Sequence, residues 1–272
     1  MATIAKTKQP VRMPRFGHRV DKTDPILRGC VGWWPLNDGA GTKAKDLSGA
    51  SLDQTLSGTT AWATTSKGTA FDFDGSSEFK YTDPGIPVST GYTISAWARF
   101  DTASTVTSNV TGADGGTGAR NFQFKRDGST GAVKLITFDS AGAATVAANG
   151  STTLNSGVWY HLVGTYDSTS GSVVYVNGSQ DGSDASTHST MFTLDDAADE
   201  LYIGHHGRGN SDRHDGYIQN VRLYDRALSA TEVSRLYSEP WAGLEPLSPF
   251  SFFSGLSQIY AYYSAAFLQR LG

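Results

Sequence analysis

Residues 159–178 read WYHLVGTYDSTSGSVVYVNG, and this stretch decides the fold class of the chain. Apolar and polar side chains alternate at period two through residues 159–166, which predicts a β-strand with one buried face. A run of β-branched and aromatic residues at 172–176 leads into Asn177-Gly178, a dipeptide typical of tight hairpin turns. We therefore predict strands on both sides of this turn.

The same pattern continues through residues 29–238. Further strands are predicted at residues 92–100, 201–204 and 217–224, with glycine, aspartate, asparagine and serine between them. One short helix is expected after Ser229, because Glu232 three positions later completes a capping box. The spacing of the turns predicts an all-β body, a sandwich or a jelly roll, with one short helix.

The composition agrees with a β-protein. Among 272 residues there are 31 glycines, and aspartate outnumbers glutamate 21 to 5, which argues against a helical chain. The 6 Trp, 12 Tyr and 13 Phe residues supply enough apolar surface for a large core. Cys30 is the only cysteine, so no intrachain disulfide forms, and the N-terminus lacks the apolar region of a signal peptide.

Charge divides the chain into three parts. Residues 1–28 form a basic extended arm with a net charge of +5, whereas the rest of the chain carries −9. The positive charge of the arm favours an anionic partner, either nucleic acid or an acidic protein surface. The negative net charge of the remaining residues argues against a direct nucleic-acid role for the body. Residues 29–238 form the body, and residues 239–272 form an aromatic tail.

The tail carries a helical stripe of large apolar side chains. Docking on another subunit accounts for this surface best, while packing on the chain's own body and membrane contact are the alternatives. Residues 250–268 are uncharged but too polar for a membrane span, so no membrane partner is expected. The predicted assembly residues are Arg12, Arg15, Arg19, Trp241, Phe252, Phe253, Leu256, Tyr260, Tyr263, Phe267 and Leu271.

The body resembles the laminin-G-like, concanavalin A-like jelly-roll family. The resemblance rests on seven pieces in order: GWWPLNDG at 32–39, DLSG at 46–49, FDFDG at 71–75, YTISAW at 92–97, WYHLVGTYD at 159–167, VYVNG at 174–178 and DGYIQNVRLYDRALS at 215–229. With the strand pattern, it implies the full predicted fold class: all-β, a two-sheet antiparallel jelly-roll sandwich with one short helix and extended N- and C-terminal arms. It also implies a protein without catalytic activity that binds glycans or proteins or serves as a structural module.

The resemblance further implies one structural calcium ion. Asp38, Asp46, Asp74 and Asp215 stand at the matching motifs and would supply oxygen ligands. The alternative is that these aspartates cap turns through the neighbouring backbone. The predicted cofactor is therefore none or one structural calcium.

A histidine-rich loop at residues 205–215 is the other candidate site. Its three histidines and two aspartates would suit a transition metal, but the spacing matches no zinc motif, and an irregular solvated loop is the alternative. Such a loop can contribute to a glycan or partner site at the rim of the sandwich. The candidate residues are His205, His206, Arg208, Asn210, Arg213 and His214.

No sequence feature indicates an enzyme. None of the five glutamates lies in a strand of alternating acidic residues, and no Gly-x-Ser-x-Gly motif is present. Laminin-G-like domains similar to this one occur in phage-encoded proteins with short arms. We therefore expect a non-enzymatic virion structural protein, a capsid decoration or cement protein on the surface of a bacteriophage, made in the host cytoplasm. Its arms would bind other virion subunits or further copies of itself, and its lectin-like body would face outwards, where it can contact a surface glycan. The alternatives are a phage tail or fibre component that binds host glycans, and a cellular carbohydrate-binding module.

Overall fold

The computed structural model describes residues 19–245 except 60, 83, 87–89, 115–119, 140–144, 189–193, 195–197 and 208–211. Its helical elements are η1 (Pro25–Leu27) and α1 (Ala230–Ser238). The strands are β1 (Cys30–Trp34), β2 (Lys43–Ala44), β3 (Gln54–Ser57), β4 (Trp62–Thr65), β5 (Gly68–Asp74), β6 (Glu78–Thr82), β7 (Gly91–Phe100), β8 (Ser108–Asp114), β9 (Arg120–Arg126), β10 (Val133–Phe138), β11 (Thr145–Asn149), β12 (Trp159–Asp167), β13 (Gly171–Val176), β14 (Ser179–Asp184), β15 (Glu200–Ile203) and β16 (Asp215–Tyr224).

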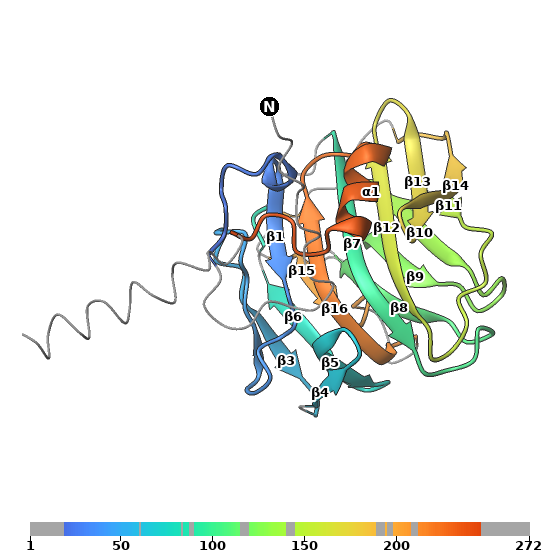
Figure 1. The fold of residues 1–272 in the computed structure, drawn as a ribbon. Helices are drawn as coiled ribbons and strands as arrows, with labels where there is room; N and C mark the ends of the chain where they lie inside the picture. The colour runs from blue at the N-terminus through green and yellow to red at the C-terminus, as the bar shows by residue number, and fades with distance from the viewer. Residues whose placement is uncertain are drawn as a thin grey trace, which may run out of the picture.

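Two antiparallel sheets form the two layers of the body (Figure 1). Sheet 1 has the order β14-β13-β12-β7-β16-β5-β4, and β1 pairs with the last part of β16. Sheet 2 has the order β11-β10-β9-β8-β15-β6-β3-β2. This architecture confirms the predicted all-β jelly-roll sandwich with one short helix.

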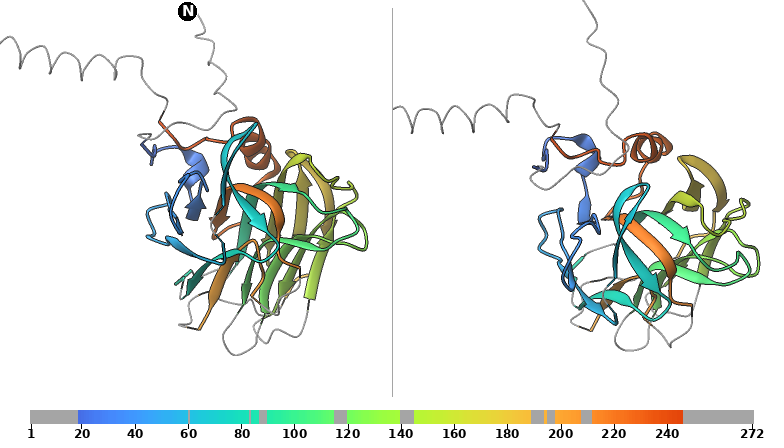
Figure 2. Two further views of the ribbon diagram at one scale, coloured as in Figure 1. Left: turned by 90° about the horizontal axis from the view of Figure 1, so that it is seen from below. Right: turned by 60° about the horizontal axis from the view of Figure 1, so that its bottom comes forward.

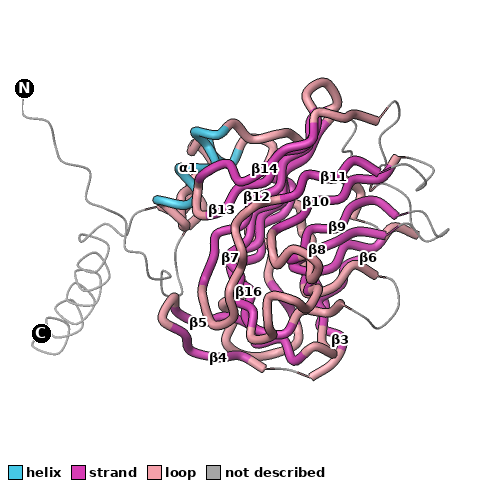
Figure 3. Tube along the Cα trace, turned by 90° about the vertical axis from the view of Figure 1, so that its right-hand side faces the viewer, coloured by secondary structure: helices cyan, strands magenta, loops and turns pink. Residues whose placement is uncertain are grey.

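The two sheets approach each other along one side of the sandwich. Seen from that side, β11 of sheet 2 lies beside β14 of sheet 1 (Figure 3). The backbone N–H of Ala147 in β11 donates a hydrogen bond of 3.1 Å to the carboxylate of Asp184 in β14. The two edge strands thus cover each other, which protects both from pairing with another chain.

Aromatic side chains fill the space between the sheets. Along β7 the side chains of Tyr92, Ala98 and Phe100 point inwards and are buried, as the alternation of a strand requires. Phe71 of β5 and Phe79 of β6 join the two sheets through an edge-to-face contact with ring centroids 4.7 Å apart. The core is therefore continuous from one sheet to the other.

The predicted hairpin is confirmed at the turn between β13 and β14. Asn177 and Gly178 have φ angles of 51° and 81°, the left-handed backbone that this dipeptide adopts easily. Val176 and Ser179 on either side are paired residues of the two strands.

Helix α1 begins and packs as its sequence predicts. The Ser229 side chain accepts a hydrogen bond from the Glu232 N–H at 3.3 Å, and the Glu232 carboxylate accepts one from the Ser229 N–H at 2.9 Å. Val233 and Leu236 are buried in one cluster with Tyr175 on the outer face of sheet 1. Figure 1 shows α1 across the upper end of this sheet, in front of β7 and β12.

The two ends of the described chain meet at one point. Val20 and Leu244 form an antiparallel bridge, and the N–H of Asp21 donates to the carbonyl of Gly243 at 2.8 Å. Figure 2 shows that η1 and α1 lie at the same end of the sandwich. The chain therefore enters and leaves the body side by side.

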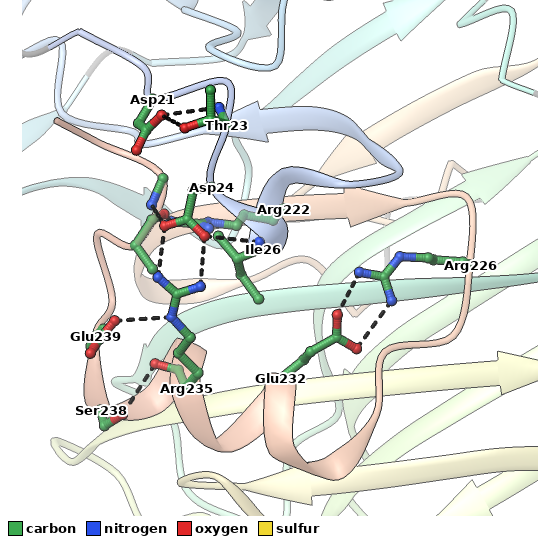
Figure 4. A network of polar contacts seen from close by, with 12 residues as sticks. Asp21, Thr23, Asp24, Ile26, Arg222, Arg226, Glu232, Arg235, Ser238 and Glu239 are labelled. Carbon is green, nitrogen blue, oxygen red and sulfur yellow. Dashed lines mark hydrogen bonds and ion pairs between the residues drawn. The ribbon is translucent and has the colours of Figure 1, made fainter.

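A polar clamp holds these two end segments together (Figure 4). Arg235 of α1 donates two hydrogen bonds to the Asp24 carboxylate, at 2.6 and 2.7 Å, and a third of 3.0 Å to Glu239. The N–H of Gly243 also donates to Asp24, at 3.1 Å. One carboxylate thus joins the N-terminal segment, the helix and the C-terminal segment.

A buried arginine fixes the C-terminal segment to β16. Arg222 is only 1% exposed, and it donates hydrogen bonds to the carbonyls of Pro240 at 3.0 Å and Ala242 at 2.9 Å. Its guanidinium lies 4.0 Å above the ring of Trp33, which also shares an apolar cluster with Trp241. Trp241 is buried on its own body, which corrects its assignment to a partner-facing surface.

The end segments differ from the predicted arms in where they start. Residues 20–28 and 239–245 pack on the sandwich through the bridge and the clamp, so the described body extends beyond the predicted range 29–238. Arg19 is exposed at the start of the described chain. Within the described residues, no helix is long and apolar enough to cross a membrane. The remaining predicted assembly residues lie outside the described part: Arg12, Arg15, Phe252, Phe253, Leu256, Tyr260, Tyr263, Phe267 and Leu271.

Candidate functional site

Asp46, a predicted calcium ligand, fastens a loop to β1. Its Oδ1 accepts hydrogen bonds from the N–H groups of Trp33 at 2.9 Å and Ser48 at 2.8 Å. Its Oδ2 accepts from the Leu52 N–H at 3.1 Å and from the Ser48 hydroxyl at 2.8 Å. Both oxygens are engaged by the protein, as the turn-capping alternative predicts.

Asp74 likewise caps the turn between β5 and β6. Its Oδ1 accepts hydrogen bonds from the N–H and hydroxyl groups of Ser76 and Ser77, and these bonds, above all that of the Ser77 hydroxyl, lower the pKa of Asp74 to about 2. Asp215 pairs with Asp74 across β16 and β5. Burial, followed by the charges of nearby aspartates, raises the pKa of Asp215.

The four predicted calcium ligands fall into two separate places. Asp38 and Asp46 belong to the loops around β2, where burial raises the pKa of Asp38 and the nearby charge of Lys45 opposes the rise. Asp74 ends β5, where it pairs with Asp215, the first residue of β16. Among the described residues, no three His, Cys, Asp or Glu side chains are arranged to hold a metal ion. The four aspartates therefore do not form one site.

His214 of the predicted rim loop is part of the core. It is fully buried, and its ring packs against Phe73 and Phe100 with centroids 5.7 and 5.1 Å apart. It also makes a hydrogen bond of 3.1 Å with the Ser108 hydroxyl. Burial lowers the pKa of His214 to about 3, so its imidazole stays neutral near pH 7. It offers no exposed group to a ligand.

The start of the rim loop folds over the outer face of sheet 2. His206 packs directly on Gly112 of β8. A Cβ atom on residue 112 would lie 2.8 Å from the Cα of His206, so only glycine leaves enough room. His205 stacks on His206 and, like Arg213, pairs with the carboxylate of Glu78. His205 and His206 are both buried, which corrects the expectation of a solvated loop with accessible imidazoles. Two further predicted loop residues, Arg208 and Asn210, lie outside the described residues.

An accessible polar and aromatic surface lies instead on the outer face of sheet 1. Cross-strand pairing places Trp159 of β12 beside Arg99 of β7, Arg99 beside Tyr217 of β16, and Tyr217 beside Asp72 of β5. All four side chains are half-buried. We call these four residues the aromatic row. With neighbouring strands roughly 4.8 Å apart, the row spans about 14 Å across the sheet.

Direct contacts organise the aromatic row. The Arg99 guanidinium lies 4.3 Å from the centre of the Tyr217 ring, and the rings of Trp159 and Tyr217 are 6.2 Å apart. Asp101 accepts two hydrogen bonds of 3.0 Å from Arg99 and fixes its plane. Burial raises the pKa of Asp72, although its hydrogen bond with Tyr217 opposes this. Tyr217 is thus held from both sides.

A second line of side chains borders the row on the side of α1. Trp97 of β7 lies between Lys67, whose Nζ is 4.0 Å from the ring centre, and Tyr237 of α1, which stacks at 5.8 Å. Burial lowers the pKa of Lys67. Tyr237 is 41% exposed and also stacks on His161 at 6.0 Å. The helix therefore ends the open surface with an exposed aromatic ring.

The lower end of sheet 1 is the part that α1 leaves uncovered (Figure 1). Tyr217 stands near the start of β16, whereas α1 packs beside the end of this strand. Val158, next to Trp159, is 45% exposed and adds apolar surface. Aromatic faces with hydrogen-bonding groups beside them suit a ligand that has both C–H surfaces and hydroxyl groups.

Only part of the aromatic row could be predicted from the sequence. Alternation in residues 92–100 assigns Trp97 and Arg99 to one face of a strand. Nothing in the sequence fixes which residues of β12, β16 and β5 stand beside Arg99, because these strands are not consecutive in the chain. The row therefore depends on the pairing register.

The family follows from a comparison with protein-family models. A model described as the concanavalin A-like lectin/glucanases superfamily matches residues 73–234. The chain belongs to this superfamily. The resemblance seen in the sequence is thereby confirmed. No curated protein sequence that was compared matches the chain.

Several solved structures share this superfamily's sandwich. The binding domain of a Paraclostridial mosquitocidal protein aligns with a TM-score of 0.60 and 15% identity over 78% of this chain and 52% of that chain. Domain 4 of the arabinanase AbnA from Geobacillus stearothermophilus, in complex with arabinotriose, gives 0.59 and 20% over 76% and 98%. A Trypanosoma rangeli sialidase gives 0.55 and 19% over 79% and 33%. At these identities the likeness concerns the fold, and this chain spans about half of the first structure and a third of the sialidase.

Proposed function

We propose that this chain is a non-enzymatic glycan-binding sandwich whose ligand lies on the aromatic row. The observation that carries the proposal is the line of Trp159, Arg99, Tyr217 and Asp72 across the uncovered end of sheet 1. The rings offer faces for sugar C–H groups, and the two charged side chains offer a donor and an acceptor for hydroxyls.

The carboxylates of this surface support binding rather than hydrolysis. Glycoside hydrolysis requires two carboxyl groups that act on opposite sides of the scissile bond. Here Asp101 is joined to Arg99 by two hydrogen bonds, and Asp72 is hydrogen-bonded to Tyr217. Their role in this proposal is to orient the arginine and the ring.

Two of the similar structures carry related functions in their names. One is described as the binding domain of a mosquitocidal protein, and another was solved with arabinotriose. These statements concern those proteins. They make a glycan a reasonable first ligand class to test for this chain.

The finer proposal is that the module is displayed on a bacteriophage virion as a capsid decoration protein. It is supported by the basic N-terminal residues 1–28 and by the bridge that places Val20 beside Leu244 at one end of the body. The bridge lies at the end of the sandwich near α1, and the row lies near the start of β16. From Tyr217 to Tyr224 the strand rises about 23 Å, so the ligand surface is well separated from the attachment point.

A glycan array tests the binding proposal. The full chain is compared with Tyr217→Ala, Trp159→Ala and the control Val106→Ala, which removes an exposed apolar side chain outside the row. Loss of a central aromatic contact typically weakens binding by about 2 kcal/mol, or roughly thirtyfold. Selective binding that Tyr217→Ala and Trp159→Ala abolish, and that Val106→Ala retains, supports the proposal. Equal binding by all variants contradicts it.

Light scattering tests the attachment proposal. The full chain is expected to form larger assemblies with itself or with capsid proteins, and a chain limited to residues 19–245 is expected to lose them. Unchanged assembly of the shortened chain would contradict attachment through residues 1–18 and 246–272. A monomeric full chain that still binds glycans would favour the cellular carbohydrate-binding module, and binding by a fibre complex would favour the tail component.

A further inference from the structure

An open recess lies on sheet 2, away from the aromatic row. It has a volume of about 460 Å³, which is within the range of sites for small molecules. Strands β3 and β6 and the ends of β2 and its loops supply the walls. The recess is lined by Lys43, Asp53, Thr55, Leu56, Ser57, Lys80, Tyr81 and Thr82.

The carboxylates at the recess are already engaged. Asp53 accepts a hydrogen bond of 2.5 Å from Lys45 through Oδ2 and one of 2.9 Å from the N–H of Asp46 through Oδ1. Glu200, beside the recess rather than in its lining, accepts one of 2.7 Å from Lys80, and it also accepts from the hydroxyls of Tyr202 and Thr82. Neither carboxylate therefore needs a further cation.

Lys43 is the cation that remains available. It is exposed at the edge strand β2, and it forms no ion pair with any described residue. Lys80, although paired with Glu200, keeps 40% of its side chain exposed at the same recess. The recess thus presents the Lys43 ammonium group, which forms no ion pair with a described residue although its charge acts on the nearby Asp53 carboxylate, on a body whose overall charge is negative.

The other walls suit a polyhydroxylated ligand. Thr55 and Ser57 contribute hydroxyl groups that can donate or accept hydrogen bonds, whereas the Thr82 hydroxyl already donates to Glu200 and remains an acceptor. Leu56 and Tyr81 contribute apolar atoms. A ligand that uses all of these walls has hydroxyl groups, a C–H surface and one anionic group.

We propose that this recess binds a sugar unit that carries a carboxylate, with the carboxylate at Lys43 and the sugar hydroxyls at Thr55, Ser57 and Thr82. The inference goes beyond the proposed function and does not depend on the aromatic row. A bare anion uses Lys43 alone, whereas an acidic sugar also fills the volume and meets the hydroxyl groups.

The test follows backbone amide shifts of the full chain by NMR during titration with glucuronate. Glucose and inorganic phosphate, at matched ionic strength, separate the contribution of the charge from that of the sugar. The variants are Lys43→Gln, the charge-conserving Lys43→Arg, and the control Lys22→Gln, which removes an exposed lysine in the N-terminal segment.

Glucuronate is expected to shift the amides of Thr55, Ser57 and Thr82, with weaker effects from glucose and phosphate. Lys43→Gln should weaken glucuronate binding about tenfold, the size of one charge-assisted hydrogen bond, while Lys43→Arg and Lys22→Gln leave it nearly unchanged. Equal binding of phosphate and glucuronate would overturn the sugar assignment. Absence of shifts at the recess, or an unaffected Lys43→Gln variant, would overturn the site. Loss of row binding in Tyr217→Ala leaves this result unchanged, so the two proposals fail independently.

Discussion

Replacing Asp24 by asparagine should measurably loosen the clamp between the two end segments. The substitution keeps the shape of the side chain but removes its charge, and with it the paired hydrogen bonds of 2.6 and 2.7 Å from Arg235. The Asp24 side chain is 13% exposed and that of Arg235 is 36% exposed, so solvent screens part of the interaction. We expect Asp24→Asn to lower the free energy of unfolding by about 2 kcal/mol.

The change should be visible in thermal unfolding followed by circular dichroism. For a domain of this size, about 2 kcal/mol corresponds to a fall in Tm of roughly 4–8 °C. The control is Asp21→Asn in the same segment, whose carboxylate is hydrogen-bonded only locally, to Thr23 at 2.6 and 3.0 Å. This control should move Tm by no more than about 2 °C.

The difference between wild type and Asp24→Asn should also depend on pH. Burial opposes the shift, but the hydrogen bonds and charge of Arg235 still lower the pKa of Asp24 below its ordinary value. The stabilisation is therefore complete above the unfolded-state pKa, near pH 4, and disappears as pH falls through the lower folded-state pKa. A Tm for Asp24→Asn equal to that of Asp21→Asn at pH 7 would refute the clamp. So would a difference from wild type that persists undiminished at the most acidic pH.

Three further predictions concern the interior and the loops. Burial lowers the pKa of both His161 and His214 to about 3. Each histidine should therefore reduce the free energy of unfolding by about 1.4 kcal/mol per pH unit as pH falls from about 6 to 4. Urea unfolding across this range measures the loss, and a free energy of unfolding that stays constant would contradict the prediction. Asp46→Ala should lower the free energy of unfolding by about 3 kcal/mol, because four hydrogen bonds are lost. A chelator should leave the Tm of the unsubstituted chain unchanged, and a fall in Tm would argue for bound calcium. Ser229→Ala should cost about 1 kcal/mol through the lost cap of α1, measured by the same unfolding assay, and no change would argue against the capping box.

Local features of the fold were readable from the sequence. The capping box at Ser229 and the turn at Asn177-Gly178 depend on residues a few positions apart, so the sequence states them directly. The alternation of the long strands similarly indicates which side chains face the core. These features made an all-β body predictable, and the resemblance to the jelly-roll family added the two-sheet arrangement.

Contacts between distant segments were not readable in this way. Trp241 looked like a partner-facing side chain because the tail is apolar, but it packs beside Trp33 of β1. His214 stands in a polar run that resembles a solvated loop, yet its ring lies between Phe73 and Phe100. In both cases the decisive neighbours are far away in the sequence, on β1 for Trp241 and on β5 and β7 for His214.

In the candidate site, too, the local strands were predictable and the contacts between distant strands were not. Arg99 and Tyr217 each belong to a predicted strand, and the alternation of each strand is visible in the sequence. Their contact at 4.3 Å exists because β7 pairs with β16 in one particular register. The residue types were thus available from the sequence, while the surface that they form was not.

The most direct test of the glycan-binding account is to locate a bound glycan on the full chain. After the array identifies a ligand, NMR spectra with and without it report the indole N–H of Trp159 and the amides of Arg99 and Tyr217. We predict that these signals shift together and that Tyr217→Ala removes the shifts. A glycan that binds while all three signals stay unchanged would contradict the assignment of its site to the outer face of sheet 1.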